Sequence, residues 1–250
     1  MSARMELYLI RHGQSVNNVI MVNADYEHLR DADPALTPLG RQQAEAAAHY
    51  LAEATNLEAL VDLPAENRRE VPPGFGITRL YSSPMLRALQ TAQPIAQALK
   101  LPVEVWVEVH EHGGLYLEYP DERGVVGFPG RTRADMQRDF PGCLLPEGIT
   151  DQGWWNPASK REDIAGCFAR AARVAAGLRR RAYSQERIAI ITHGTFAACL
   201  LKALLNMLPS DQLHYHLYNT SITRLDFRAD GHMVIRYINR IAHLPPEWVS

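Results

Sequence analysis

The sequence predicts the α/β class, with a three-layer α/β/α sandwich around a mostly parallel central sheet. Apolar runs that indicate strands buried on both faces occur at residues 5–10, 77–82 and 187–192. Capped helical stretches lie between these runs, so strands and helices alternate along the chain. A parallel sheet with helices on both faces follows, because each parallel connection has to cross one face of the sheet.

Three helices are predicted from capping signals at their first residues. A serine or threonine stands at each N-cap, followed by a proline at the first helical position or a glutamate three residues on. With their capping residues, these helices are 37–54 with Thr37 and Pro38, 83–100 with Ser83 and Pro84, and a third from Ser159 and Glu162 to about Tyr183.

The rest of the chain continues the alternation. A fourth helix follows His193 and extends through 195–208, and strands at 221–228 and 232–239 come last. Two segments, 55–76 and 113–157, interrupt the pattern with prolines, glycines and scattered charge. We expect one domain over 1–250, in which 55–76 is a surface excursion. Segment 113–157, with a short helix near 131–139, is expected to be a cap inserted over the edge of the sheet.

Composition restricts the partners that this chain can have. With 250 residues and a formal net charge of -2, it has no global attraction for nucleic acid or an anionic membrane. The apolar run near the N-terminus is too short for a secretory signal, and no apolar stretch reaches 18 residues. Three cysteines without metal-ligand spacing fit a reducing compartment. We therefore expect a cytoplasmic protein without nucleic-acid or membrane partners, with a homodimer as one possible assembly.

Two strands end in the same dipeptide, which is the strongest functional signal. LYLIRHG and IAIITHG are apolar runs that end in His12-Gly13 and His193-Gly194. In an open α/β sheet, ligands bind beyond the carboxyl ends of the strands, so both histidines are expected at that edge, facing one another. Each glycine allows a sharp turn that brings backbone N–H groups close to a bound anion.

Arginines beside these histidines indicate that the anion is a phosphate. Arg11 adjoins His12, and its forked donors match phosphate oxygens while its charge disfavours protonation of the imidazole. Arg87 lies one turn into a predicted helix and can direct a second fork to the same anion. The Asn18 amide can contact an equatorial oxygen, with Asn17 and Ser15 as alternatives.

These motifs together resemble the histidine phosphatase superfamily, the phosphoglycerate mutase-like proteins. The matching stretches are RHGQSVNN, SSPMLRALQTA, an acidic residue just before GG, and THG, in that order from Arg11 to Gly194. The resemblance implies a phosphohistidine at His12, a carboxyl general acid, and hydrolysis of a phosphorylated metabolite without metal or cofactor. It also implies a phosphate pocket formed by Arg11, Asn18, Arg87, His193 and Gly194.

Two glutamates are candidates for the general acid. Residues 103–110 alternate strictly, so Glu108 is expected to continue a polar strand face shared with Glu104, Trp106 and His110. Glu111 comes where the alternation stops and the chain enters Gly113-Gly114. Because that position is the carboxyl end of the strand, we expect Glu111 to be the acid, although many family members have a spacing closer to that of Glu108.

Other functions stay open at this point. A mutase would share the first half of the reaction but return the phosphoryl group to its substrate. Two His-x-His pairs, at 110 and 112 and at 214 and 216, have the spacing of zinc ligands, so a metal-dependent hydrolase is an alternative. A binding protein without turnover is less favoured, because it needs neither nucleophile nor acid. Candidates for the cap's contacts to the rest of a substrate are Tyr116, Tyr119, Phe128, Trp154 and Trp155, with Arg123, Arg131 or Arg133 for a second anionic group.

Overall fold

The computed structural model describes residues 3–61, 64, 66–67, 71–210 and 212–250. Its main sheet has the strand order β3-β2-β6-β1-β7-β8, in which β1, β6, β2 and β3 are mutually parallel and β7 is antiparallel to both neighbours. The fold class predicted from the sequence is confirmed. The strands are β1 (Ala3–Arg11), β2 (Arg79–Ser82), β3 (Val103–Val105), β6 (Arg187–Thr192), β7 (Ile222–Arg228) and β8 (Met233–Arg240).

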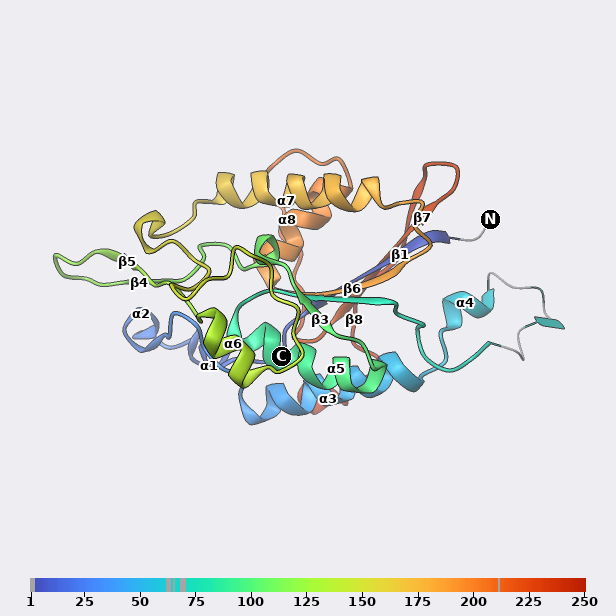
Figure 1. Ribbon diagram of the computed structural model, residues 1–250, viewed down its shortest axis with the longest axis horizontal. Helices are drawn as coiled ribbons and strands as arrows, with labels where there is room; N and C mark the ends of the chain where they lie inside the picture. Colours follow the sequence, from blue (N-terminus) through green and yellow to red (C-terminus); the bar gives the residue numbers. More distant parts are fainter. Residues whose placement is uncertain (1–2, 62–63, 65, 68–70, 211) are drawn as a thin grey trace.

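Helices cover both faces of this sheet (Figure 1). Helices α7 (Ile164–Arg180) and α8 (Gly194–Leu204) pack on one face, and α3 (Pro38–Glu53) and α5 (Leu86–Leu99) on the other. The central strands are apolar on both sides for this reason: Ile188 and Ile190 of β6 face the α7 and α8 side, whereas Ala189 and Ile191 face the other core. Within the described residues, no helix is long and apolar enough to cross a membrane.

The structure confirms one predicted helix cap, that of α3, and corrects those of α5 and α7. Thr37 caps α3 as expected, because its side chain accepts from the Gly40 N–H at 3.0 Å. Helix α5 begins only at Leu86, because the Ser83 hydroxyl is 2.8 Å from a His193 ring nitrogen and the Leu86 N–H is taken by Asp33 at 2.9 Å.

Helix α7 also begins later than predicted. Its N-cap is Asp163, which accepts from the Gly166 N–H at 2.7 Å. The predicted capping box of Ser159 and Glu162 is wrong. Ser159 ends a separate 3-10 turn (Pro157–Ser159), Lys160 has φ 51, and the Glu162 carboxylate binds Arg170 instead.

The strand predicted over 103–110 is much shorter in the structure. β3 ends at Val105, and Val107–Val109 form a 3-10 turn. The last sheet hydrogen bond runs from the Trp106 N–H to the Ser82 carbonyl at 2.9 Å. Beyond it, side chains from α7 and β6 take the backbone carbonyls, so the chain leaves the sheet. The alternation of Glu108 with Glu104 on one strand face is therefore not observed.

The two irregular segments differ in their burial. In 55–76, where 62–63, 65 and 68–70 lie outside the described residues, helix α4 (Leu57–Val61) follows the buried Asn56, and Phe75 is also buried. This segment is therefore not wholly the surface excursion that we expected. Segment 113–157 contains a hairpin of β4 (Tyr116–Glu118) and β5 (Val125–Gly127), then α6 (Arg133–Asp139).

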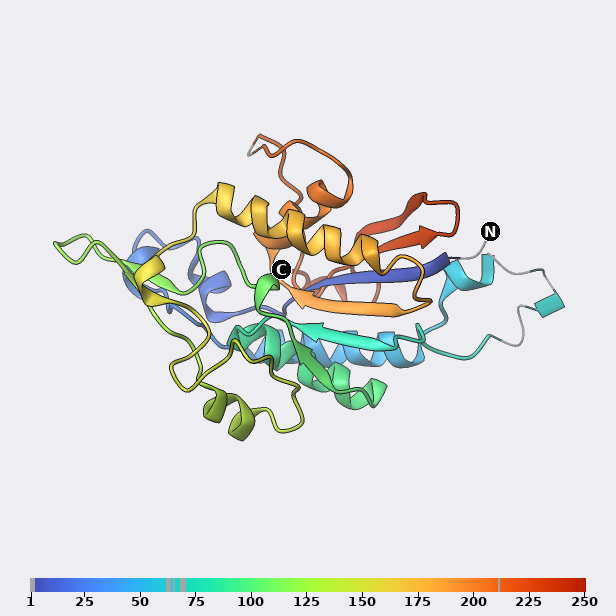
Figure 2. The same cartoon turned by 45° about the horizontal axis from the view of Figure 1, so that its top comes forward.

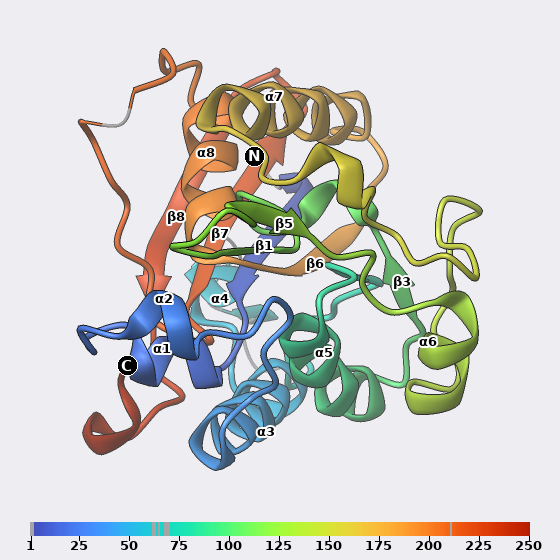
Figure 3. The ribbon, with the colours of Figure 1, turned by 90° about the vertical axis from the view of Figure 1, so that its left-hand side faces the viewer.

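The strands β1, β2 and β6 point to one end of the molecule (Figure 2). Viewed from that end, the β4–β5 hairpin crosses in front of the sheet, with α1 (Val16–Ile20) and α2 (Tyr26–Leu29) beside it (Figure 3). This hairpin of segment 113–157 thus lies over the carboxyl ends of the parallel strands, whereas α6 lies to the side, near α5 and β3 (Figure 3).

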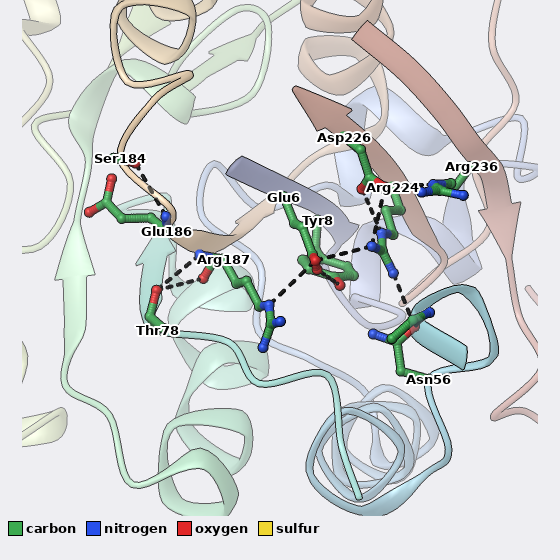
Figure 4. Close-up of polar contacts among 11 residues, drawn as sticks. Glu6, Tyr8, Asn56, Thr78, Ser184, Glu186, Arg187, Arg224, Asp226 and Arg236 are labelled. Atoms are coloured by element: carbon green, nitrogen blue, oxygen red, sulfur yellow. Dashed lines mark hydrogen bonds and ion pairs between the residues drawn. The ribbon is translucent and has the colours of Figure 1, made fainter. Parts of the chain in front are cut away.

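The opposite end of the sheet holds a buried charge network (Figure 4). Arg224 of β7 has only 1% of its side chain exposed and binds the fully buried Asp226 at 2.7 Å. It also lies 3.2 Å from Glu6 and donates to Asn56 at 3.0 Å. Each of these charges is matched, as burial requires. The hydrogen bond from Arg224 to Asn56 links the start of the 55–61 region to β7 of the sheet.

Candidate active site

A polar cavity of about 360 Å³ opens at the carboxyl ends of β1 and β6. It is lined by residues from the end of β1, from α1 and α2, from the starts of α5 and α8, from the cap hairpin and from residues 214–217. Six of the seven site residues predicted from the sequence line it: Arg11, His12, Asn18, Arg87, Glu111 and Gly194.

His12 stands at the base of this cavity with its ring held on both sides. Its Nδ1 is 2.6 Å from the Gly13 carbonyl oxygen, which requires a proton on Nδ1. Its Nε2 accepts a hydrogen bond from Arg87 Nε at 3.1 Å and is therefore the unprotonated nitrogen. Burial lowers the pKa of His12 well below its usual range, and the charges of Arg87 and Arg11 lower it further. A neutral imidazole with a free lone pair on Nε2 is a nucleophile.

Packing around Gly13 fixes this geometry. A Cβ on Gly13 would lie 2.4 Å from the Gly40 carbonyl oxygen, so α3 approaches the loop as closely as it does only because residue 13 is glycine. The Gly13 N–H donates to the Thr91 hydroxyl at 3.0 Å, which links the loop to α5.

Arg87 is carried by the first turn of α5 and is 8% exposed. The Asp33 carboxylate accepts from the Leu86 N–H and lies near the Arg87 charge. Burial raises the pKa of Asp33 to about 6, while the Arg87 charge acts in the opposite direction. Asp33 thus anchors the start of the helix that delivers the guanidinium.

Arg11 and Asn18 present further donors to the cavity. Arg11 donates through one terminal nitrogen to the Leu217 carbonyl, and its Nε has no partner among the described residues. Asn18 Oδ1 accepts from the Ser15 N–H and hydroxyl, both at 3.0 Å, so its Nδ2 is the atom left for an anion. Asn17, the alternative to Asn18, is engaged at both ends by the Asp31 backbone.

His193 lies beside His12 but does not line the cavity. The two ring centroids are 5.1 Å apart, and His193 is fully buried. Its Nε2 is 2.8 Å from the Ser83 hydroxyl, whereas its Nδ1 has no partner within the described part of the chain. Burial lowers the pKa of His193 well below its usual range, with Arg87 and His12 adding to the effect. A direct phosphate contact from His193 stays a prediction.

Glu111 and Glu108, the two candidate acids, occupy different places. The Glu111 carboxylate lines the cavity and accepts from the N–H groups of Phe196 at 2.8 Å and Thr195 at 3.2 Å, at the start of α8. Glu108 instead pairs with Arg173 at 2.8 Å, with 41% of its side chain exposed. The geometry favours Glu111 for contact with a leaving group.

This geometry agrees with comparisons to known proteins. A family model described as the histidine phosphatase superfamily (branch 1) matches residues 7–62 and 65–240. The chain belongs to this superfamily. The match covers most of the chain, from Leu7 in β1 to the end of β8 at Arg240.

Relatives of this histidine phosphatase carry several names. The probable phosphoglycerate mutase GpmB of Yersinia enterocolitica is 25% identical over 246 residues, which are 96% of this chain and 95% of that protein. The serine/threonine-protein phosphatase Pgam5 of Caenorhabditis elegans, named as mitochondrial, is 25% identical, and the match covers 100% of this chain and 67% of that protein.

Among solved structures, the phosphoserine phosphatase of Entamoeba histolytica in complex with 3-phosphoglyceric acid is similar. It has a TM-score of 0.55 and 24% identity, with 96% of this chain and 100% of that chain covered. A mycobacterial glucosyl-3-phosphoglycerate phosphatase has a TM-score of 0.53 and 22% identity, with 94% and 98% covered. These likenesses show the shared fold.

The histidine phosphatase cavity contains an arginine that the sequence analysis missed. Arg30, just after α2, lines the cavity with 12% of its side chain exposed, and its Nε has no partner among the described residues. Its guanidinium lies 4.5 Å from the ring centre of Tyr116 in the cap hairpin, and its ion pair with Glu27 is long, at 3.5 Å. No motif marks Arg30, because it is distant in sequence from both Arg11 and Arg87.

The arginines that we expected to reach a second anion lie elsewhere. Arg123 pairs with Asp121, Arg131 pairs with Asp139, and Arg133 donates to the carbonyls of Ile149 and Pro146. None of the three lines the cavity. Of the expected aromatic wall, only Tyr116 does. Phe128, Trp154 and Trp155 belong to an apolar cluster that joins the cap to α5, and Tyr119 contacts the Arg123 guanidinium.

The His-x-His pairs do not form a metal centre in this phosphatase. His112, His214 and His216 line the cavity, but His110 is buried, with Nδ1 2.6 Å from the Val107 carbonyl oxygen. Across the residues described, no three His, Cys, Asp or Glu side chains are grouped so that they could hold a metal ion.

Proposed function

We propose that this histidine phosphatase hydrolyses small phosphomonoesters through a phosphohistidine at His12. The observation that carries the proposal is the state of the His12 ring: Nδ1 is tied to the Gly13 carbonyl, and Nε2 faces the cavity as an acceptor for Arg87. A nucleophile in this tautomer, among guanidinium groups, suits attack on phosphorus.

In the first half of the reaction, Nε2 attacks phosphorus and the bond to the ester oxygen breaks. Arg87 turns from Nε2 to the phosphate oxygens, which it holds together with Arg11, Asn18 and the Gly194 N–H. These donors stabilise the charge on the equatorial oxygens. The Glu111 carboxyl group gives a proton to the leaving alkoxide.

In the second half, water replaces the alcohol. The Glu111 carboxylate takes a proton from this water as its oxygen attacks phosphorus, and the bond from phosphorus to Nε2 breaks. The backbone N–H groups of Thr195 and Phe196 orient the carboxylate. Inorganic phosphate and the neutral His12 ring are the products.

The test is trapping of the intermediate on His12. Brief incubation with labelled substrate followed by an alkaline quench should leave a base-stable, acid-labile phosphate on His12, and His12→Ala should abolish both label and turnover. The control is His49→Ala, since His49 on α3 has 73% of its side chain exposed. Activity that survives in His12→Ala, or that disappears with a chelator and returns with zinc, contradicts the proposal.

We also propose that the alcohol part of the substrate carries a carboxylate, bound by Arg30. With Arg30, three guanidinium groups of the described residues line the cavity, whereas its carboxylates are those of Glu27 and Glu111. Among these residues, the cavity thus has one more positive than negative side chain. The named ligand and substrates of two similar structures, 3-phosphoglyceric acid and glucosyl-3-phosphoglycerate, support this class. We place the protein in the cytoplasm, because its cysteines are free thiols.

A further inference from the structure

Arg170 lies on α7, outside the cavity, and is only 3% exposed. Its Nη1 donates to two backbone carbonyls of the segment that precedes Glu111: Glu108 at 2.7 Å and His110 at 2.8 Å. The carbonyl between them, that of Val109, accepts from the Thr192 hydroxyl at 2.7 Å. Three successive carbonyls are thus held by side chains rather than by the sheet.

A carboxylate completes this arrangement. Glu162 binds Arg170 through both oxygens, at 2.9 Å to Nε and 2.5 Å to Nη2, so the buried guanidinium is neutralised. The Glu162 N–H also donates to the Gly113 carbonyl at 3.1 Å. The Arg170–Glu162 pair therefore binds backbone carbonyls both before Glu111, at residues 108 and 110, and after it, at Gly113.

The same guanidinium contacts the helix that receives the carboxylate. It lies 4.5 Å from the ring centre of Phe196, whose N–H donates to Glu111 at 2.8 Å. Arg170 consequently contacts the segment that carries Glu111 and the residue that binds its side chain. No Arg170 atom is needed at the phosphate for it to influence proton transfer.

We propose that Arg170, with Glu162, is a positioning residue that sets the place of the Glu111 carboxyl relative to the leaving group. This inference rests on the proposed function, in which Glu111 is the general acid. A displacement of the acid by about 1 Å can cost on the order of a hundredfold in rate. The rate should decrease mainly for substrates whose leaving group needs a proton.

The test compares an alkyl phosphate with an aryl phosphate of an acidic phenol, in wild type, Glu111→Gln and Arg170→Lys. Lysine keeps the charge but cannot reach both carbonyls and Glu162 together. We compare kcat/KM, because it reports phosphoryl transfer to His12 and not the hydrolysis step that both esters share. We expect Arg170→Lys to lower kcat/KM on the alkyl ester by about tenfold or more and to affect the aryl ester much less, so the aryl-to-alkyl ratio of kcat/KM rises. In the double variant with Glu111→Gln, the ratio should rise no further than in Glu111→Gln alone.

Arg173→Met is the matched control. Arg173 lies on the same helix and also contacts Glu108, but it binds the exposed Glu108 carboxylate and not the backbone carbonyl. Arg173→Met should therefore keep the wild-type aryl-to-alkyl ratio. Glu162→Gln should raise the ratio in the same direction as Arg170→Lys, which covers the case in which the arginine variant does not fold.

The outcomes separate the two proposals. If Glu111→Gln raises the ratio but Arg170→Lys and Glu162→Gln lower both rates equally, Arg170 is merely structural and the inference fails alone. If Glu111→Gln leaves the ratio flat, Glu111 is not the acid, and the inference fails together with that part of the proposed function.

Discussion

The surroundings of His12 keep its imidazole ring neutral. The ring is buried and its pKa is lowered, first by desolvation and then by Arg87 and Arg11. The neutral form is therefore present at neutral pH and is lost only as the pH falls far below the usual range of histidine. In the proposed reaction Arg87, which donates to Nε2 in this structure, turns to the phosphate oxygens.

Arg30 is the residue that we expect to distinguish substrates. Arg30→Gln should raise KM for 3-phosphoglycerate by about tenfold, because a charged hydrogen bond to a carboxylate contributes on the order of 1.5–3 kcal/mol. The rise should be much smaller for glycerol 3-phosphate, in which a hydroxymethyl group replaces the carboxylate. Steady-state kinetics on both esters measure this difference.

Arg123→Gln is the control for Arg30, because Arg123 lies in the cap but pairs with Asp121 outside the cavity. It should leave both KM values unchanged. Equal rises of KM for the two esters in Arg30→Gln would mean that Arg30 shapes the cavity without recognising a carboxylate.

At the scale of elements, the start of α7 can be tested directly. Asp163 accepts from the Gly166 N–H at 2.7 Å, so Asp163→Ala should lower the free energy of unfolding by about 1 kcal/mol. Ser159→Ala should have no such effect, since Ser159 belongs to the preceding 3-10 turn. Urea unfolding of both variants measures the difference, and the opposite ranking would restore Ser159 as the cap.

The parallel strands and most helices could be predicted because their signals are local. The apolar run 187–192 is buried from Ile188 onward, and Thr37 caps its helix through the Gly40 N–H, three residues on in the sequence. The starts of α5 and α7 were misplaced because distant partners decided them. Asp33 takes the Leu86 N–H, and Arg170 takes the Glu162 carboxylate that the predicted capping box needed.

The site was predictable to the extent that its residues follow strands. His12 and Gly194 follow strands and line the cavity, as expected. Glu111 also lines the cavity, but β3 ends at Val105, so a 3-10 turn and not a strand end brings it there. Arg30, Asp33 and Ser83 could not be found in this way, because only the folded chain brings them near His12. The strand expected over 103–110 ends early for the same reason. Thr192 and Arg170, which are distant in sequence, donate hydrogen bonds to the carbonyls of Val109 and Glu108, so these carbonyls do not pair in the sheet.

At the scale of the whole molecule, buried histidines make stability depend on pH. Burial lowers the pKa of His110 to about 3 and that of His243 to about 4, and it also lowers those of His12 and His193. Below about pH 6.5 the unfolded chain binds protons that the folded chain does not, so the free energy of unfolding falls as the pH falls. Between pH 7 and pH 5, His110 alone contributes a loss of about 2 kcal/mol.

Urea unfolding at pH 7 and pH 5 measures this loss. His110→Gln should show a drop smaller than that of the wild type by about 2 kcal/mol, whatever its stability at pH 7. His49→Gln, at an exposed position, should keep the full drop. An undiminished drop in His110→Gln would show that His110 is already charged in the folded protein at pH 5.

The buried pair of Arg224 and Asp226 has an evolutionary consequence. Each partner has a second one: Asp226 also pairs with Arg236 at 2.5 Å, and Arg224 lies 3.2 Å from Glu6. Removing one charge therefore unbalances a group of four rather than a single pair, and a buried charge that loses its partners is costly. Among homologous chains, positions 6, 224, 226 and 236 should be inherited as a group, with positive and negative charges gained or lost together, even though none of these residues lines the cavity.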